Sequence, residues 1–176
     1  ITVLVAGFNC AAVAAEAATI NGVSKVLLAD NTAYQHQLAE NIAALVAKLG
    51  KEFSHILTAA TTTGKNFLPR VAAMLDVAQI SDVIAIEAAD TFIRPIYAGN
   101  AIATVKSADA VKVLTVRPAA FRAAETGNNA PVEAVAAVHD AGLSAFVAEE
   151  LTKSERPELS AARVVISGGR GMQNGE

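Results

Sequence analysis

The sequence is poor in cysteine and in aromatic residues. It has one cysteine, Cys10, no tryptophan, two tyrosines and six phenylalanines among 176 residues. A single thiol excludes an intrachain disulfide and any metal site built from several cysteines, and it is compatible with a reducing compartment. No apolar run reaches the roughly 20 residues that a helix needs to cross a bilayer. We therefore expect no direct membrane insertion and a core built from Ala, Val, Ile and Leu.

The sequence also lacks an excess of positive charge. The 14 Lys and Arg residues are outnumbered by 17 Asp and Glu, which gives a net charge of −3. A nucleic-acid binder or a polybasic membrane binder needs a positive surface, so no nucleic acid is expected as a partner. Apolar residues, in contrast, make up 53% and charged residues 18%. This composition supports a substantial core, and the length fits one domain or one domain and part of another.

Strand-like and helix-like stretches alternate along the first part of the chain. Apolar, β-branched runs predict strands at residues 1–6, 24–29 and 54–60, and helical spacing of apolar residues predicts helices at residues 11–19, 38–49 and 66–75. This alternation indicates βαβ units, and the continuous apolar strands indicate a parallel sheet that is covered on both faces. The predicted fold class is α/β, a Rossmann-like three-layer sandwich with a mostly parallel sheet.

The pattern changes after Asp76. Short strands joined by Gly, Asn and Asp turns are predicted at residues 82–88, 92–98, 102–106 and 111–116. A turn at residues 99–100 predicts a hairpin, so this portion of the sheet is expected to be mixed or antiparallel. The small, polar residues 123–131 predict a loop.

The last part of the chain suggests a second domain. Residues 1–150 are expected to form an N-terminal α/β domain, and the charged, proline-containing residues 151–160 a linker. A strand beginning at Arg163 then runs into a glycine turn, so residues 161–176 are expected to open another domain. Because the sequence opens directly on a strand and closes just after this turn, we interpret the chain as a fragment of a larger two-domain subunit.

The titratable side chains form no recognisable catalytic or metal-binding pattern. Cys10 follows a strand near a helix N-terminus, a position that can lower a thiol pKa, but no histidine partner is evident and a packed thiol is expected. A nucleophile elbow of the Gly-x-Ser-x-Gly type is absent, and neither catalytic nor metal-ligating residues are predicted. Histidines expected to be exposed or locally hydrogen-bonded, and carboxylates expected at strand ends and turns, are His36, His55, His139, Asp76, Asp82, Glu87 and Asp90.

Residues 61–66, with the sequence TTTGKN, follow the third predicted strand and open a helix. Free N–H groups at a helix N-terminus attract anions. The segment nevertheless lacks the first glycine of a P-loop, and Asn66 replaces the Ser or Thr that follows the lysine. We favour a strand-to-helix turn with a threonine cap. A nucleotide-binding or sensing module of the same α/β architecture, using the turn at residues 63–65, stays open as the alternative.

Residues 167–171, with the sequence SGGRG, carry the clearest binding signal. Gly169 and Gly171 let the backbone approach a ligand closely, and Arg170 between them supplies a cation for a phosphate, a carboxylate or an electron-rich ring. A glycine turn with a surface arginine explains these residues equally well.

Five segments, taken in their order and spacing, match one known family. They are residues 64–73, 80–86, 90–101, 154–159 and 165–171. The run YAGNA, and the run RPEL that leads to GGRG, are the specific ones. The chain resembles the alpha subunit of electron transfer flavoprotein over essentially its whole length.

The resemblance implies a function. Members of this family shuttle electrons from acyl-CoA and related dehydrogenases to a membrane quinone oxidoreductase through FAD, and they carry out no substrate chemistry of their own. The alpha subunit forms a heterodimer with a beta subunit that binds AMP, in the bacterial cytoplasm or the mitochondrial matrix. The resemblance also implies that a first strand and helix precede residue 1, and that most FAD contacts lie beyond residue 176.

Residue by residue, the resemblance places only one turn at the flavin. Arg170 matches the arginine that lies beside FAD, and Gly169 and Gly171 flank it, so these three are the expected cofactor-binding residues. A cation there would favour the anionic reduced forms of a flavin. The N-terminal domain is expected to act mainly as a scaffold and subunit interface, with Arg94, Tyr97 and the turn around Asn100 as candidate contacts or as a plain structural hairpin.

Overall fold

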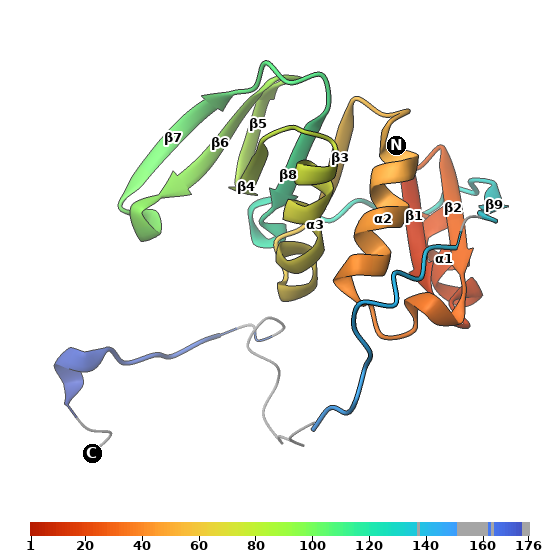
Figure 1. The fold of residues 1–176 in the computed structure, drawn as a ribbon. Coiled ribbons are helices and arrows are strands. Elements are labelled where there is room, and N and C mark those ends of the chain that lie inside the picture. Colours follow the sequence, from red (N-terminus) through yellow and green to blue (C-terminus); the bar gives the residue numbers. More distant parts are fainter. Residues whose placement is uncertain (137, 151–161, 163, 174–176) are drawn as a thin grey trace. The chain divides into compact units, whose positions relative to one another are not determined.

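The structure is a computed structural model that describes residues 1–136, 138–150, 162 and 164–173 (Figure 1). The chain divides into two compact units, Ile1–Phe146 and Val147–Glu176, and each is described by itself. The first unit contains the α/β architecture. The second contains one short helical turn, Arg170–Met172, among its described residues.

The first unit opens with a βαβ arrangement. Strand β1 (Thr2–Gly7) is followed by helix α1 (Ala11–Ala18) and strand β2 (Lys25–Asp30), and the two strands pair in parallel from Thr2 with Lys25 to Gly7 with Asp30. A short strand, β9 (Val132–Ala134), pairs in parallel with the other edge of β2. These three strands form one sheet in the order β1-β2-β9.

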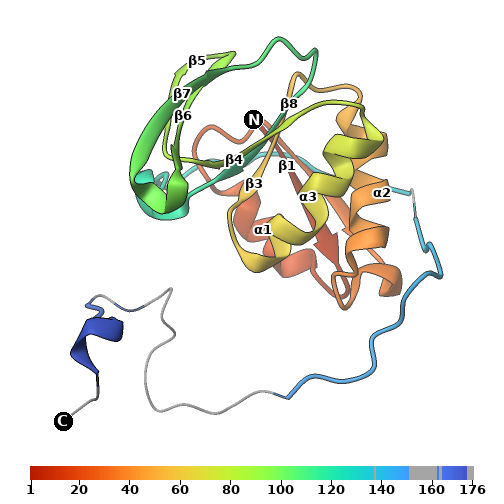
Figure 2. The same cartoon turned by 60° about the vertical axis from the view of Figure 1, so that its left-hand side comes forward.

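A second parallel sheet is built from the middle of the chain. Helix α2 (Ala39–Gly50) leads to strand β3 (His55–Ala59), and helix α3 (Thr62–Met74) leads to strand β4 (Gln79–Val83). Strand β8 (Lys112–Val116) lies between them, in the order β3-β8-β4. Helices α2 and α3 lie side by side (Figures 1 and 2) and contact each other.

A third, antiparallel sheet holds strands β5 (Ala85–Ala88), β6 (Thr91–Ile96) and β7 (Ala101–Lys106) in that order. A 3-10 turn at Tyr97–Gly99 joins β6 to β7. Phe92 on β6 and Val105 on β7 pack with Leu114 of β8, so this sheet shares a core with the second one.

The helices cover both faces of the first parallel sheet. Side chains alternate between the two faces of a strand, so successive residues of β1 contact different helices. Val3 and Val5 pack with α1, whereas Leu4 and Ala6 pack with α2. Helix α3 continues the α2 layer over Ile56 and Val113 of the second sheet. The predicted three-layer α/β class is therefore confirmed, with three three-stranded sheets in place of a single continuous one.

Predicted and observed bounds differ for several elements, and two of these differences have a clear physical cause. Helix α3 begins at Thr62, four residues earlier than predicted, because the Thr61 hydroxyl accepts a hydrogen bond from the Gly64 N–H and caps the helix. Pro69 therefore lies inside the helix. The single strand predicted at residues 82–88 is divided into β4 and β5, with Asp82 at a φ of 59° and a shift of register between Ile80 and Val83.

The sequence predicts no helix or strand in the segment after β9. In the structure this segment packs against α2 and the turn that precedes α2. The His139 N–H donates to the Tyr34 hydroxyl, and the Ala141 N–H donates to Oδ1 of the buried Asn41. Phe146 stacks on His36 with ring centroids 3.9 Å apart. The predicted linker at residues 151–160 lies outside the described residues.

Candidate functional site

The predicted flavin contact, Arg170, opens the short helical turn of the second unit. The Gly169 carbonyl accepts a hydrogen bond of 3.0 Å from the Met172 N–H. A Cβ added at Gly169 or Gly171 would meet no atom within 4 Å. Packing within the described chain therefore does not require glycine at these two positions. Arg170 is exposed and makes no ion pair with a described residue.

The apolar run that leads to this turn is exposed. Val164 is 78% and Ile166 is 96% accessible to solvent. Residues 164–169 belong to no strand in the structure, and Arg163, where the strand was predicted to begin, lies outside the described residues. Adjacent exposed aliphatic side chains are typical of a surface that another element covers.

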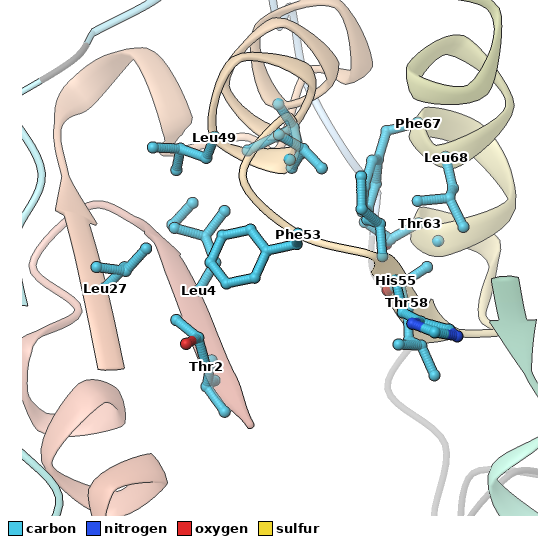
Figure 3. A pocket seen from close by; sticks show the side chains of 18 of the residues that line it. Thr2, Leu4, Leu27, Leu49, Phe53, His55, Thr58, Thr63, Phe67 and Leu68 are labelled. Atoms are coloured by element: carbon cyan, nitrogen blue, oxygen red, sulfur yellow. The ribbon is translucent and has the colours of Figure 1, made fainter. Parts of the chain in front are cut away.

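The first unit contains a cavity of about 620 Å³ (Figure 3). One wall is β1 with Leu4, and the other is β3 with Thr58; Phe53 projects between them. Helix α2 contributes Leu49 and α3 contributes Phe67. The lining holds no Lys, Arg, Asp or Glu side chain. A phosphate-bearing ligand would find no side-chain cation among these residues.

The TTTGKN turn lies at one end of this cavity, where Thr61, Thr63 and Gly64 line it. A Cβ at Gly64 would lie 2.1 Å from the Ala59 carbonyl oxygen, so glycine is required here by close packing of the helix on β3. The predicted threonine cap is confirmed by the hydrogen bond of 3.2 Å to Thr61 Oγ1. Lys65 is exposed and lies outside the cavity lining.

Asp82 is the centre of a polar cluster where β4 ends. Its N–H donates to Oγ1 of the buried Thr115 at 2.8 Å, and its carboxylate accepts two hydrogen bonds from Arg117. Arg94 lies next to this pair, since its Nε donates to the Ser81 carbonyl at 2.7 Å. The hydrogen bonds from Arg117 hold the pKa of Asp82 below its ordinary value. The cluster ties β4, β6 and β8 together and uses Asp82 as a structural acceptor.

Cys10 precedes α1 and is buried. Oδ1 and Oδ2 of Asp30 accept hydrogen bonds from the Asn9 and Cys10 N–H groups at 2.8 and 3.0 Å. Burial, and secondarily the negative charge of Asp30, raise the pKa of the Cys10 thiol. The packed thiol is confirmed, and the lowered pKa that a helix N-terminus can produce is not found.

The three histidines lie apart. His36 stacks on Phe146, and His55 contacts the Ala89 carbonyl at 2.6 Å. The His139 backbone N–H donates to the Tyr34 hydroxyl, whereas its ring Nε2 is buried and has no hydrogen-bond partner among the described residues. Among the residues that the structure describes, no group of three or more His, Cys, Asp or Glu could hold a metal ion. Within the same residues, no helix has both the length and the apolar character needed to cross a membrane.

The candidate contacts on the β6–β7 hairpin divide into two kinds. Arg94 is engaged inside the chain through Ser81. Tyr97 is 80% exposed, and Asn100 is exposed beside it. Tyr97 and Ala98 have φ values of 50° and 55°, in the left-handed region that non-glycine residues seldom adopt.

Sequence reasoning missed two features of the site. Arg117 was not singled out, although it is the partner of Asp82, because 35 residues separate the two. The cavity was also missed. The continuous apolar pattern of β1 is typical of a fully buried strand. Residues 2–6 are only partly buried in the structure, because this strand faces the cavity.

Comparison with known proteins gives a consistent picture. A family model described as "Electron transfer flavoprotein domain" matches residues 1–140. The electron transfer flavoprotein subunit alpha of Pseudomonas aeruginosa is 66% identical over 177 residues, covering 100% of this chain and 57% of that protein. The subunit alpha of Paracoccus denitrificans is 57% identical, with the same two coverages. The mitochondrial subunit alpha of Dictyostelium discoideum is 48% identical and is covered to 54%. The chain thus spans little more than half the length of these curated relatives.

Proposed function

The chain belongs to the electron transfer flavoprotein domain family, and from this premise we propose that it is part of an alpha subunit that carries electrons by means of FAD. The observation that carries this proposal is the match of the whole chain at 66% identity to one alpha subunit. The chain would serve as scaffold and subunit interface, and the cofactor would perform the redox chemistry. No catalytic residue is proposed, because an electron carrier transforms no substrate of its own.

Arg170, Gly169 and Gly171 are the proposed flavin contacts of this chain. The exposed guanidinium and the open space at both glycines support this assignment. Arg170 would lie beside the flavin and favour its negatively charged reduced forms. When bound, FAD accepts and releases the electrons; the arginine orients it and sets the local charge. The remaining contacts would come from segments that this chain does not include.

The division of the chain follows from the same proposal. Residues 1–150 would be the N-terminal domain, residues 151–160 a linker, and residues 161–176 the first strand and glycine turn of an FAD-binding domain. The exposure of Val164 and Ile166 supports it, because such side chains need a core to cover them.

The proposed partners are a beta subunit that holds AMP, acyl-CoA and related dehydrogenases as electron donors, and a quinone oxidoreductase as acceptor. The word "alpha" in the relatives' names supports a heterodimer. Bacterial and mitochondrial relatives support a bacterial cytoplasm or a mitochondrial matrix as the compartment.

The decisive experiment uses the complete subunit, purified together with its partner subunit. We expect a flavin absorption spectrum that is bleached by an acyl-CoA dehydrogenase in the presence of its substrate. The chain of residues 1–176 alone should retain no flavin. A colourless complex that takes up no added FAD would refute the proposal.

Substitution of Arg170 tests its role separately. In the complete complex, Arg170→Ala should lower the flavin midpoint potential and weaken FAD retention, whereas Arg170→Lys should restore part of both because it keeps the charge.

Tyr97→Ala and Asn100→Ala test the hairpin in the same complex. If it is a subunit contact, both should reduce heterodimer formation in size-exclusion chromatography while leaving the circular dichroism spectrum unchanged.

The nucleotide-binding alternative has weaker support. Thr61, Thr63 and Gly64 do line a cavity. However, Gly64 is explained by its contact with Ala59, and Lys65 is not part of the lining. Saturable binding of ATP or AMP to residues 1–176, measured by calorimetry, would bring this alternative forward.

A further inference from the structure

Three cationic side chains gather where the strands of the second sheet end. They are Lys65, Arg94 and Arg117, and the carboxylate of Asp82 lies among them. We propose that they form a docking surface for an acidic segment of a partner protein, one that presents at least two Asp or Glu side chains. The inference rests on charge and geometry within the first unit and would stand if the proposed electron-transfer function were wrong.

Backbone hydrogen bonds hold the ends of three elements together at this place. The Ala60 N–H donates to the Val116 carbonyl at 2.7 Å, which sets the start of α3 beside the end of β8. The Arg117 N–H donates to the Val83 carbonyl at 2.9 Å and joins the end of β8 to that of β4. Figure 1 shows the start of α3 and the end of β8 at the same end of the first unit. Lys65, in the first turn of α3, and Arg117 are therefore brought together by the backbone itself.

Arg94 reaches the same place from the antiparallel sheet and is held there with donors to spare. Its Nε donates to the Ser81 carbonyl at 2.7 Å, and its side chain is partly buried. Its two terminal amino groups make no hydrogen bond to a described residue. A guanidinium offers its donors in a planar fork that matches a carboxylate, and one that is already fixed loses little conformational entropy on binding. Arg94 is thus suited to be the centre of recognition.

Positive charge is in excess in this cluster. Arg117 donates two hydrogen bonds to Asp82, so these two charges compensate each other. Those hydrogen bonds lower the pKa of Asp82 most, and the charges of Lys65 and Arg94 lower it further. Neither Lys65 nor Arg94 makes an ion pair with a described residue. Two uncompensated cations therefore lie side by side in a chain whose net charge is −3.

A partner can reach these cations from solvent. Lys65 is exposed, and the Arg117 side chain is 45% accessible. Charges that are fixed on a surface and complementary to those of a partner steer the encounter and set its orientation. A nucleic acid fits less well, because such a partner is commonly bound through about 6 to 10 phosphates.

The position of Asp82 favours an acidic segment over a small anion. A phosphate or a single carboxylate placed among the three cations would be repelled by the carboxylate that already lies there. A segment with several acidic side chains avoids this repulsion, because separate carboxylates can reach Arg94 and Lys65 from the outside. Asp82 thus holds Arg117 in place and leaves the other two cations to the partner.

Binding of a fluorescently labelled hexaglutamate peptide to the chain of residues 1–176 tests this surface by fluorescence anisotropy. We expect saturable binding at low ionic strength that weakens as salt is added, and no binding of hexaglutamine. Lys65→Glu should weaken the affinity for hexaglutamate by at least about 10-fold.

Lys51→Glu is the matched control for this experiment. Lys51 is also exposed, and it lies after α2 and ahead of β3, at the opposite end of the strands. The substitution makes the same change of net charge and should alter the affinity by less than about twofold. Absence of hexaglutamate binding, or equal losses from the two variants, would overturn the inference.

Asp82→Asn gives a readout of opposite sign. It removes the carboxylate among the cations, so hexaglutamate should bind about threefold more tightly at low ionic strength. A role of Asp82 in stability alone predicts no gain in affinity. Circular dichroism verifies that the variant is folded. Unchanged or weaker binding by the folded variant would place the peptide elsewhere and contradict the docking surface.

Inorganic phosphate separates an acidic segment from a small anion as the occupant. Phosphate and sodium chloride are added to the hexaglutamate complex at equal ionic strength. Both should displace the peptide to the same extent, because they act by screening alone. Stronger displacement by phosphate would reveal a small-anion site and overturn the assignment to an acidic segment.

Discussion

Strands β8 and β1 are both short, apolar and parallel to their neighbours, yet they are buried to different degrees. Strand β8 pairs with β3 on one edge and β4 on the other, and its residues Val113, Leu114 and Thr115 are fully buried. Strand β1 pairs with β2 alone, and residues 2–6 are only partly buried. Similar sequences therefore differ in burial because of their neighbours in the sheet. The difference is that β8 is the central strand of its sheet and β1 is an edge strand.

We expect the largest difference in the free energy of unfolding when a leucine in each of the two strands is replaced by alanine. Leu114→Ala in β8 should lower the free energy of unfolding by about 3 kcal/mol, because it leaves a cavity in a closed core. Leu4→Ala in β1 should cost about 1 kcal/mol, since part of that side chain is already in contact with solvent. Urea denaturation of both variants measures the difference. Equal losses would show that β1 is as well packed as β8.

The next effect concerns the close approach of α3 to β3. Gly64→Ala places a methyl group against the Ala59 carbonyl, a backbone atom that cannot move aside easily, and should cost about 2 kcal/mol. Gly22→Ala is the matched control. Gly22 has a φ of 89° but open space around it, so only backbone strain of about 1 kcal/mol is expected. Thermal unfolding compares the two, and a milder effect at Gly64 would argue against tight packing there.

A smaller, pH-dependent effect is expected on the β8 side, at Asp82. Its pKa is lowered in the folded protein, so its contribution to stability is fully present above the ordinary value of 3.8 and is lost as the pH falls through the lowered pKa. Asp82→Asn tolerates the positive φ and removes the charge; at neutral pH it should cost about 1 kcal/mol. The stability gap between the two proteins should close below pH 3.8. A gap that stays constant with pH would contradict the charge-assisted pairing with Arg117.

The smallest effect lies at the end of β1, on the Cys10 thiol. Because burial and Asp30 raise its pKa above the ordinary value of 9.0, alkylation by iodoacetamide at neutral pH should be slower than that of a free thiol. The rate should increase on denaturation in urea. Fast alkylation of the folded protein would show that the end of β1 is more open than the structure indicates.

The sequence predicts the elements of the first unit well where local patterns determine them. The apolar spacing of α2 and the β-branched runs of β1 and β3 predict those elements almost to their ends. Strand β9 is not predicted from the sequence, because it consists of three exposed residues and is defined only by its pairing with β2. The early start of α3 is not predicted either, because residues 61–64 have the composition of a loop and the packing of Gly64 on Ala59 is a tertiary contact.

The candidate site is predicted less completely than the fold. Arg170 and its flanking glycines are identified through a family motif, whereas their described surroundings contain no partner for the guanidinium. The pairing of Asp82 with Arg117 depends on the shifted register of β4 and the positive φ of Asp82, neither of which has a sequence signature. Local sequence patterns do not predict contacts between distant segments or contacts with groups outside the chain.

Open strand edges also bear on how this polypeptide behaves at high concentration. Strand β7 is an edge strand of the antiparallel sheet, six residues long and without proline, and it alternates half-buried and exposed residues with Lys106 at its end. Together with the edges of β1 and β3, it offers unpaired backbone to neighbouring molecules. Residues 1–176 should therefore self-associate as their concentration rises, and light scattering should show this oligomerisation.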